Sequence, residues 1–86
     1  MSYFTHHGKL YEIVESSPVD EAGFHYECWD LTLGTGGDLG RIIVPEADES
    51  DGEEIQIRLT RPVPVQVLLR WMHFVPELER YGISPG

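Results

Sequence analysis

The sequence is poor in cysteine, in basic residues and in long apolar runs. Its 86 residues include one cysteine, Cys28, so no disulfide can form within the chain. No segment approaches the ~20 consecutive apolar residues that a membrane-spanning helix needs, and the first residues do not resemble a signal peptide. We therefore expect a reduced, cytoplasmic protein with no membrane partner.

Positive charge is scarce and unevenly placed. Six Lys and Arg residues stand against fifteen Asp and Glu residues, a formal net charge of −9. Residues 1–54 hold thirteen acids and two bases, a net −11, whereas residues 55–86 hold four bases and two acids, a net +2. Such a charge repels phosphate backbones, so we expect no direct nucleic-acid binding. It suits attraction to a basic protein surface.

The residues that could carry chemistry form no complete motif. The glycine-rich segment 34–40 has Leu39 where a dinucleotide-binding fingerprint needs glycine, and we expect a hairpin tip there. Counting back from Gly52 would put an alanine at the first position of an EF-hand calcium loop. His25 and Cys28 are three residues apart on a predicted strand and would point to opposite faces. We expect Cys28 to be a buried structural residue, and we predict no catalytic residue, no metal site and no cofactor.

Apolar runs that alternate with turn signals predict a small sheet. The composition, 41% hydrophobic, is sufficient for one core, and we expect a single α+β domain over residues 1–86. Strands are predicted at residues 9–16, 24–33, 39–45 and 54–61. The fourth is the clearest, since Ile55, Ile57 and Leu59 alternate with polar residues. Short connections favour a four-stranded antiparallel β-meander.

One helix is predicted after the sheet, packed on one of its faces. Pro62 and Pro64 end the sheet, and the helix should run from Val65 to Arg80. Pro76 should kink or divide it near Phe74 or Val75. Gly82 is the expected stop.

The predicted helix has more apolar surface than one sheet face can cover. Its apolar arc is roughly 220° wide, against the ~100° that docking requires. The excess flank consists of Val67, Trp71, Phe74 and Leu78. Exposed apolar patches of this kind are typical of interaction sites, so this flank is a predicted partner-binding surface. The alternative is that the loops or the N-terminal segment, with Tyr3 and Phe4, fold over it.

The apolar residues of the second predicted strand do not all fall on one face. Phe24, Tyr26 and Cys28 fall on one face, and Trp29, Leu31 and Leu33 fall on the other. Either a bulge near Cys28 and Trp29 shifts the register, or the sheet is apolar on both faces.

These features favour binding over catalysis. We expect a non-enzymatic protein-binding module, an acidic blocker of a basic partner surface in the manner of inhibitor, immunity or antitoxin proteins. Its second predicted contact surface is an acidic loop that includes Glu46, Asp48, Glu49 and Asp51. The alternatives are a homo-oligomer, most simply a homodimer, that binds a small ligand, an inhibitor that imitates nucleic acid, and a small enzyme with a site at a dimer seam.

Overall fold

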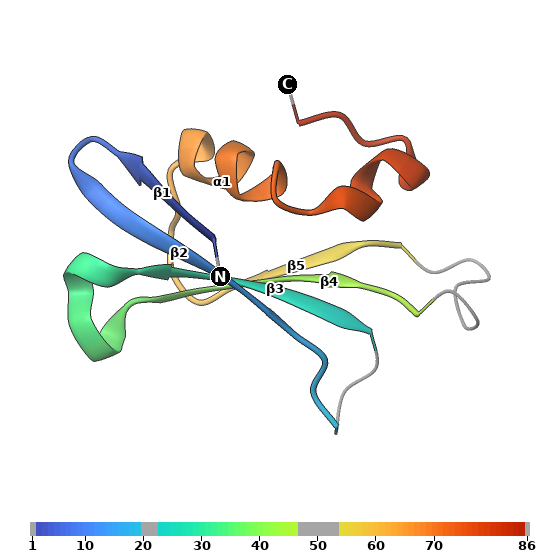
Figure 1. The fold of residues 1–86 in the computed structure, drawn as a ribbon, viewed down its shortest axis with the longest axis horizontal. Coiled ribbons are helices and arrows are strands. Elements are labelled where there is room, and N and C mark those ends of the chain that lie inside the picture. Colours follow the sequence, from blue (N-terminus) through green and yellow to red (C-terminus); the bar gives the residue numbers. More distant parts are fainter. Residues whose placement is uncertain (1, 20–22, 47–53, 86) are drawn as a thin grey trace.

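The structure is a computed structural model, and it describes residues 2–19, 23–46 and 54–85. It is an α+β fold with an antiparallel sheet in the order β1-β2-β3-β4-β5, and the helical segments of residues 65–81 lie on one side of that sheet (Figure 1). The strands are β1 (Ser2–His6), β2 (Lys9–Ser16), β3 (Phe24–Asp30), β4 (Asp38–Val44) and β5 (Gln56–Leu59). The helices are α1 (Val65–Met72) and the 3₁₀ segments η1 (Leu31–Gly36) and η3 (Pro76–Tyr81). The predicted antiparallel meander is confirmed, but it has five strands, not four, and the helix is short. None of the helices in the described ranges is both long and apolar enough to span a membrane.

The additional strand, β1, pairs with β2 through a two-residue turn. His6 lies opposite Lys9, and the residues between them, His7 and Gly8, have φ angles of 50° and 78°. Two positive φ angles are what the tight hairpin turn with the correct twist requires. Glycine supplies one of them without strain, and histidine is among the residues that tolerate the other.

A bulge is present between Cys28 and Trp29, which is one of the two alternatives that the sequence left open. Cys28 lies opposite Gly40 and Trp29 lies opposite Asp38, so Leu39 is an extra residue on β4. The shift lets Leu39 reach the core, where it is buried. Gly40 has a φ of 134°, and a Cβ built on it would lie 2.1 Å from the Arg58 carbonyl oxygen of β5. Glycine at position 40 therefore permits the close approach of β5 to the bulge.

The end of β3 comes earlier than predicted. Residues 31–33, expected in a strand, begin η1, where Leu31 and Leu33 are exposed. The Asp30 Oδ1 atom accepts a hydrogen bond of 3.0 Å from the Thr32 backbone N–H. Such a side-chain acceptor caps the turn and competes with continued strand pairing.

The predicted division of the helix before Pro76 is confirmed. α1 ends at Met72, Val75 is extended with φ −106° and ψ 95°, and Pro76 then starts η3. A residue before proline is pushed out of the helical region, which explains the extended Val75. Gly82 ends η3 in the left-handed conformation with a φ of 73°, as expected.

Candidate functional site

The predicted partner-binding flank of the helix lies in the core. Val67 and Trp71 are 0% exposed and Leu78 is 2% exposed, while Phe74 is half-buried. The Trp71 Nε1 atom donates a hydrogen bond of 3.0 Å to the Tyr26 carbonyl oxygen of β3. The prediction that this flank is surplus surface is therefore wrong, because α1 turns Val67 and Trp71 toward the sheet and Leu78 of η3 is buried as well.

β1 covers part of this flank, as the alternative prediction for the N-terminal segment stated. The Phe4 ring stacks on Phe74 with ring centroids 5.8 Å apart and on Tyr11 with centroids 5.1 Å apart. The Arg70 guanidinium lies 4.9 Å from the centre of the Phe4 ring and also donates a hydrogen bond to the Thr5 carbonyl oxygen. These contacts fix β1 against α1.

The second predicted contact surface is only partly described. Glu46 is exposed at the end of the segment that follows β4. Asp48, Glu49 and Asp51 lie outside the described residues.

Surplus apolar surface does exist on α1, on the flank opposite to the predicted one. Val65 is 69% exposed and Leu69 is 38% exposed. Leu68 and Met72, which lie between this flank and the core, are half-buried. The wide apolar arc of the helix is thus shared between the sheet and a side that opens toward β5.

An apolar groove lies between this side of α1 and β5. It has a volume of about 230 Å³. Its lining residues are apolar apart from Gln56 and consist of Ile42, Ile55, Gln56, Ile57, Leu68, Met72, Leu78 and Ile83. On β5 itself, Ile57 is 44% exposed and Leu59 is 42% exposed. Ile57 and Leu59, which form the apolar face of this strand, are therefore open to solvent.

The backbone of β5 is also available at its outer edge. Within residues 2–19, 23–46 and 54–85, β5 pairs only with β4. The Thr60 N–H donates a hydrogen bond of 3.0 Å to the Leu39 carbonyl oxygen, so the backbone groups of residue 60 face β4. Because this orientation alternates along an antiparallel strand, those of Ile57 and Leu59 face outward. An exposed edge of this kind is a template for pairing with another chain.

We use the name β5 edge site for this edge together with its groove, that is, Ile55, Ile57 and Leu59 with Leu68 and Met72. It combines outward backbone donors and acceptors with an adjoining apolar surface. That combination is the one by which proteins add an extended segment to a sheet, with main-chain hydrogen bonds for affinity and pockets for alternate side chains.

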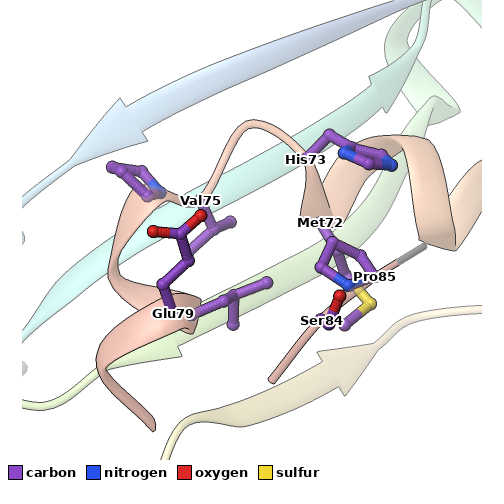
Figure 2. Close-up of a pocket in the computed structure, with 8 residues that line it drawn as sticks. Met72, His73, Val75, Glu79, Ser84 and Pro85 are labelled. Atoms are coloured by element: carbon purple, nitrogen blue, oxygen red, sulfur yellow. The ribbon is translucent and has the colours of Figure 1, made fainter. Parts of the chain in front are cut away.

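A second cavity lies beyond the C-terminal end of α1. Its volume is about 280 Å³, and it is lined in part by His73, Glu79 and Ser84. Figure 2 shows the His73 and Glu79 side chains on opposite sides of the cavity. Among the described residues, no hydrogen bond joins His73, Glu79 and Ser84 to one another. The Ser84 hydroxyl is therefore not activated as a nucleophile by a neighbouring base. Both cavities fall below the ~300 Å³ at which small-molecule pockets usually begin.

The remaining candidates for chemistry have structural contacts. Cys28 is fully buried, and burial, followed by the charges of Asp30 and Asp38, raises the pKa of its thiol to about 12. The thiol therefore stays protonated near neutral pH and is a poor nucleophile. His25 is buried on the opposite face of β3, where its Nδ1 atom lies 3.0 Å from Arg41 Nη1. No group of three His, Cys, Asp or Glu side chains converges on a point within the part of the chain that the structure describes.

Sequence reasoning identified the alternation in residues 55–59 but placed the binding surface elsewhere. The signal for the β5 edge site was present, since a strand followed by a Pro-Val-Pro break is the last of its sheet and the last strand of a meander is an edge. Comparison with models of known families, with curated proteins and with solved structures found no match.

Proposed function

We propose that this chain is a protein-binding module that receives an extended segment of another polypeptide at the β5 edge site. The observation that carries the proposal is the outward-facing backbone of Ile57 and Leu59 beside an apolar groove. The exposed edge and the open groove are each unfavourable for a protein that binds no partner there. An exposed edge strand invites aggregation, and an open apolar groove destabilises the free protein, so their coincidence supports a binding role.

The two ends of the sheet differ in a way that supports this choice of edge. At the other edge, β1 is tied to α1 by the Arg70 contact with the Thr5 carbonyl oxygen and by the stacked ring of Phe4. β5 has no such cover among the described residues, and all four of its residues are exposed. Natural sheets protect an edge by covering or charging it, and this protection is weaker at β5 than at β1.

The charge distribution adds a role in encounter. Residues 1–54, with a net charge of −11 as counted above, attract a basic surface, whereas the β5 edge site belongs to residues 55–86. A blocker of a basic partner would use the acidic part to accelerate association and the β5 edge site to dock. Mutating charged residues on this acidic part should then change the association rate and its salt dependence more than the dissociation rate.

Site-specific photo-crosslinking in cells of the source organism tests the proposal. A photoreactive amino acid replaces Leu69, the exposed residue that follows the groove residue Leu68, or Leu10, at the start of β2. These two leucines are matched, since they are 38% and 39% exposed. We expect a discrete crosslinked protein from position 69 and none, or much less, from position 10. Equal yields from both positions, or a discrete product from position 10 alone, would refute the proposal.

A further inference from the structure

We propose that the segment received at the β5 edge site is β5 of a second copy of this chain, paired antiparallel across a two-fold axis. This inference rests on the proposed function, because it needs the same edge to be open. The result is one continuous sheet through both copies, with α1 of each copy on the same side. The sequence of β5 and its flanks supports this occupant in three ways.

The first support is the register that the backbone allows. Residues on β5 whose N–H and C=O groups face outward have odd numbers, since those of Thr60 face β4. A two-fold axis at Ile57 places Ile57 opposite Ile57 of the second copy and Ile55 opposite Leu59 of the second copy. The Ile57 pair uses outward backbone groups on both strands. The second pair does so when β5 extends by one residue to Ile55, which directly precedes it. Each also pairs two apolar side chains on the groove side of the sheet.

The second support is charge on the other side of the strand. In this register Arg58 lies opposite Gln56 of the second copy and diagonal to its Glu54, an opposite charge. The competing register, with the axis at Arg58, also satisfies the backbone but sets two arginines directly opposite each other. Such pairs lie about 4.5 Å apart at Cα, where like charges are destabilising. Charge therefore selects the register that also pairs the apolar residues.

The third support is the distribution of acidic residues along the chain. Residues 55–86 carry a net +2, and the other residues carry −11. A contact along β5 and α1 therefore joins two copies through their least acidic parts. Strands in a sheet lie about 4.8 Å apart, so the apolar side chains of the second β5 would extend the floor of the groove beside Leu68 and Met72.

The solution mass is the first test, measured by size-exclusion chromatography with light scattering at increasing concentration. The chain has a mass of 9.8 kDa, and we expect the mass to approach twice this value as concentration rises. A sample at about 1 mM detects any dimer with a dissociation constant below about 1 mM. Ile57→Lys sets two lysines opposite each other on the axis and should remain monomeric. Thr5→Lys, on the other edge strand, is the matched control and should dimerise like the wild type.

The register is tested by disulfide trapping. Ile57→Cys places two thiols opposite each other, with about 5.5 Å between the Cα atoms, within the range that a disulfide accepts. Oxidation should give a covalent dimer in high yield for Ile57→Cys and in low yield for Arg58→Cys. The wild type is the control for Cys28, which is fully buried. As a gain of contact, Gln56→Glu puts a carboxylate opposite Arg58 twice per dimer and should tighten it about three- to tenfold.

The outcomes separate this inference from the proposed function. A wild-type chain that stays monomeric overturns the inference. So does a dimer that persists in Ile57→Lys, provided that circular dichroism shows a folded variant, or a dimer that Arg58→Cys traps better than Ile57→Cys. If the chain is monomeric and position 69 crosslinks to a protein of another mass, the β5 edge site binds a foreign segment and the proposed function stands. If position 69 gives no product above position 10, the proposed function fails as well.

Discussion

Replacing Trp71 with phenylalanine should destabilise the isolated chain strongly. Trp71 is 0% exposed, and its Nε1 atom donates a 3.0 Å hydrogen bond to the Tyr26 carbonyl oxygen, which joins α1 to the central strand β3. Truncating a buried tryptophan to alanine costs about 3–5 kcal/mol, and phenylalanine restores rather more than half of the lost volume. About 1–2 kcal/mol of packing is then lost, together with about 1 kcal/mol for the hydrogen bond.

The expected loss is therefore about 2–3 kcal/mol, out of about 4–13 kcal/mol for a domain of this length. This loss corresponds to a decrease in melting temperature of roughly 10–20 °C, at 4–8 °C per kcal/mol. Urea unfolding followed by far-ultraviolet circular dichroism measures it without relying on tryptophan fluorescence. Leu69→Ala is the matched control on the same helix, and because Leu69 is 38% exposed it should cost about 1 kcal/mol or less.

Measurements at two protein concentrations keep folding separate from association, since only a linked dimer has a concentration-dependent midpoint. The difference between Trp71→Phe and the wild type should persist at the lower concentration. If Trp71→Phe cost less than about 0.5 kcal/mol, or no more than Leu69→Ala, Trp71 would not be a core residue. The assignment of the two flanks of α1 would then be reversed, and the original interface prediction would be restored.

Three further predictions concern the bulge at Gly40, the hydrogen bond between Tyr26 and Glu77, and the burial of Cys28. Gly40→Ala should cost about 2–4 kcal/mol, from its positive φ and a Cβ that meets the β5 backbone, whereas Gly82→Ala, with open space around it, should cost about 1 kcal/mol. Equal thermal shifts for the two would contradict the close approach at the bulge. Tyr26→Phe removes a 2.7 Å hydrogen bond to the Glu77 carboxylate and should cost about 1–2 kcal/mol by urea titration, while Tyr81→Phe should cost little. Burial raises the pKa of Cys28 from 9.0 to about 12, so the unfolded chain loses this proton first and stability should fall as the pH rises from 9 toward 12. The steepest contribution is about 1.4 kcal/mol per pH unit, and an unchanged slope in Cys28→Ala would refute it.

Much of the sheet follows from local signals in the sequence. The predicted strand at residues 9–16 has the bounds of β2, because residues with high β propensity fill it and Pro18 follows it closely. The register shift near Cys28 and Trp29 was one of two outcomes that the change of parity indicated. The extra residue lies on β4, however, so Leu31 and Leu33 stay exposed and do not join the core face. The division of the helix was predictable because Pro76 cannot continue it.

The missing strand and the overlong one share a cause in turn chemistry. β1 was not predicted because its turn uses His7 where asparagine or aspartate is the usual signal beside glycine. The predicted strand 24–33 was too long because its apolar residues continue past Asp30, whose side chain instead caps a 3₁₀ turn. In both places one side chain decides the backbone conformation, and hydrophobic periodicity does not report it.

The rotation of the helix about its axis was predicted wrongly, and this error placed the candidate site on the flank that faces the sheet. Periodicity gives the width of an apolar arc, but an arc wider than one sheet face leaves its rotation open. Contacts between distant residues set the rotation, namely Trp71 with the Tyr26 carbonyl oxygen and Tyr26 with Glu77. Both are polar contacts of aromatic side chains, and hydropathy counts neither. Exposed apolar residues were therefore predicted on the helix, but they were assigned to the wrong flank.

Charge distinguishes the two kinds of occupant that the β5 edge site could receive. Two copies of a chain with net charge −9 repel each other at long range, whereas a basic partner is attracted. Added salt screens both effects, over a distance of about 10 Å at 0.1 M ionic strength. It should therefore tighten pairing between two copies, whose contact is mainly apolar, and weaken binding to a basic partner. The sign of the salt dependence thus reports which surface of this molecule dominates association, the acidic residues of the first part or the apolar edge of the second.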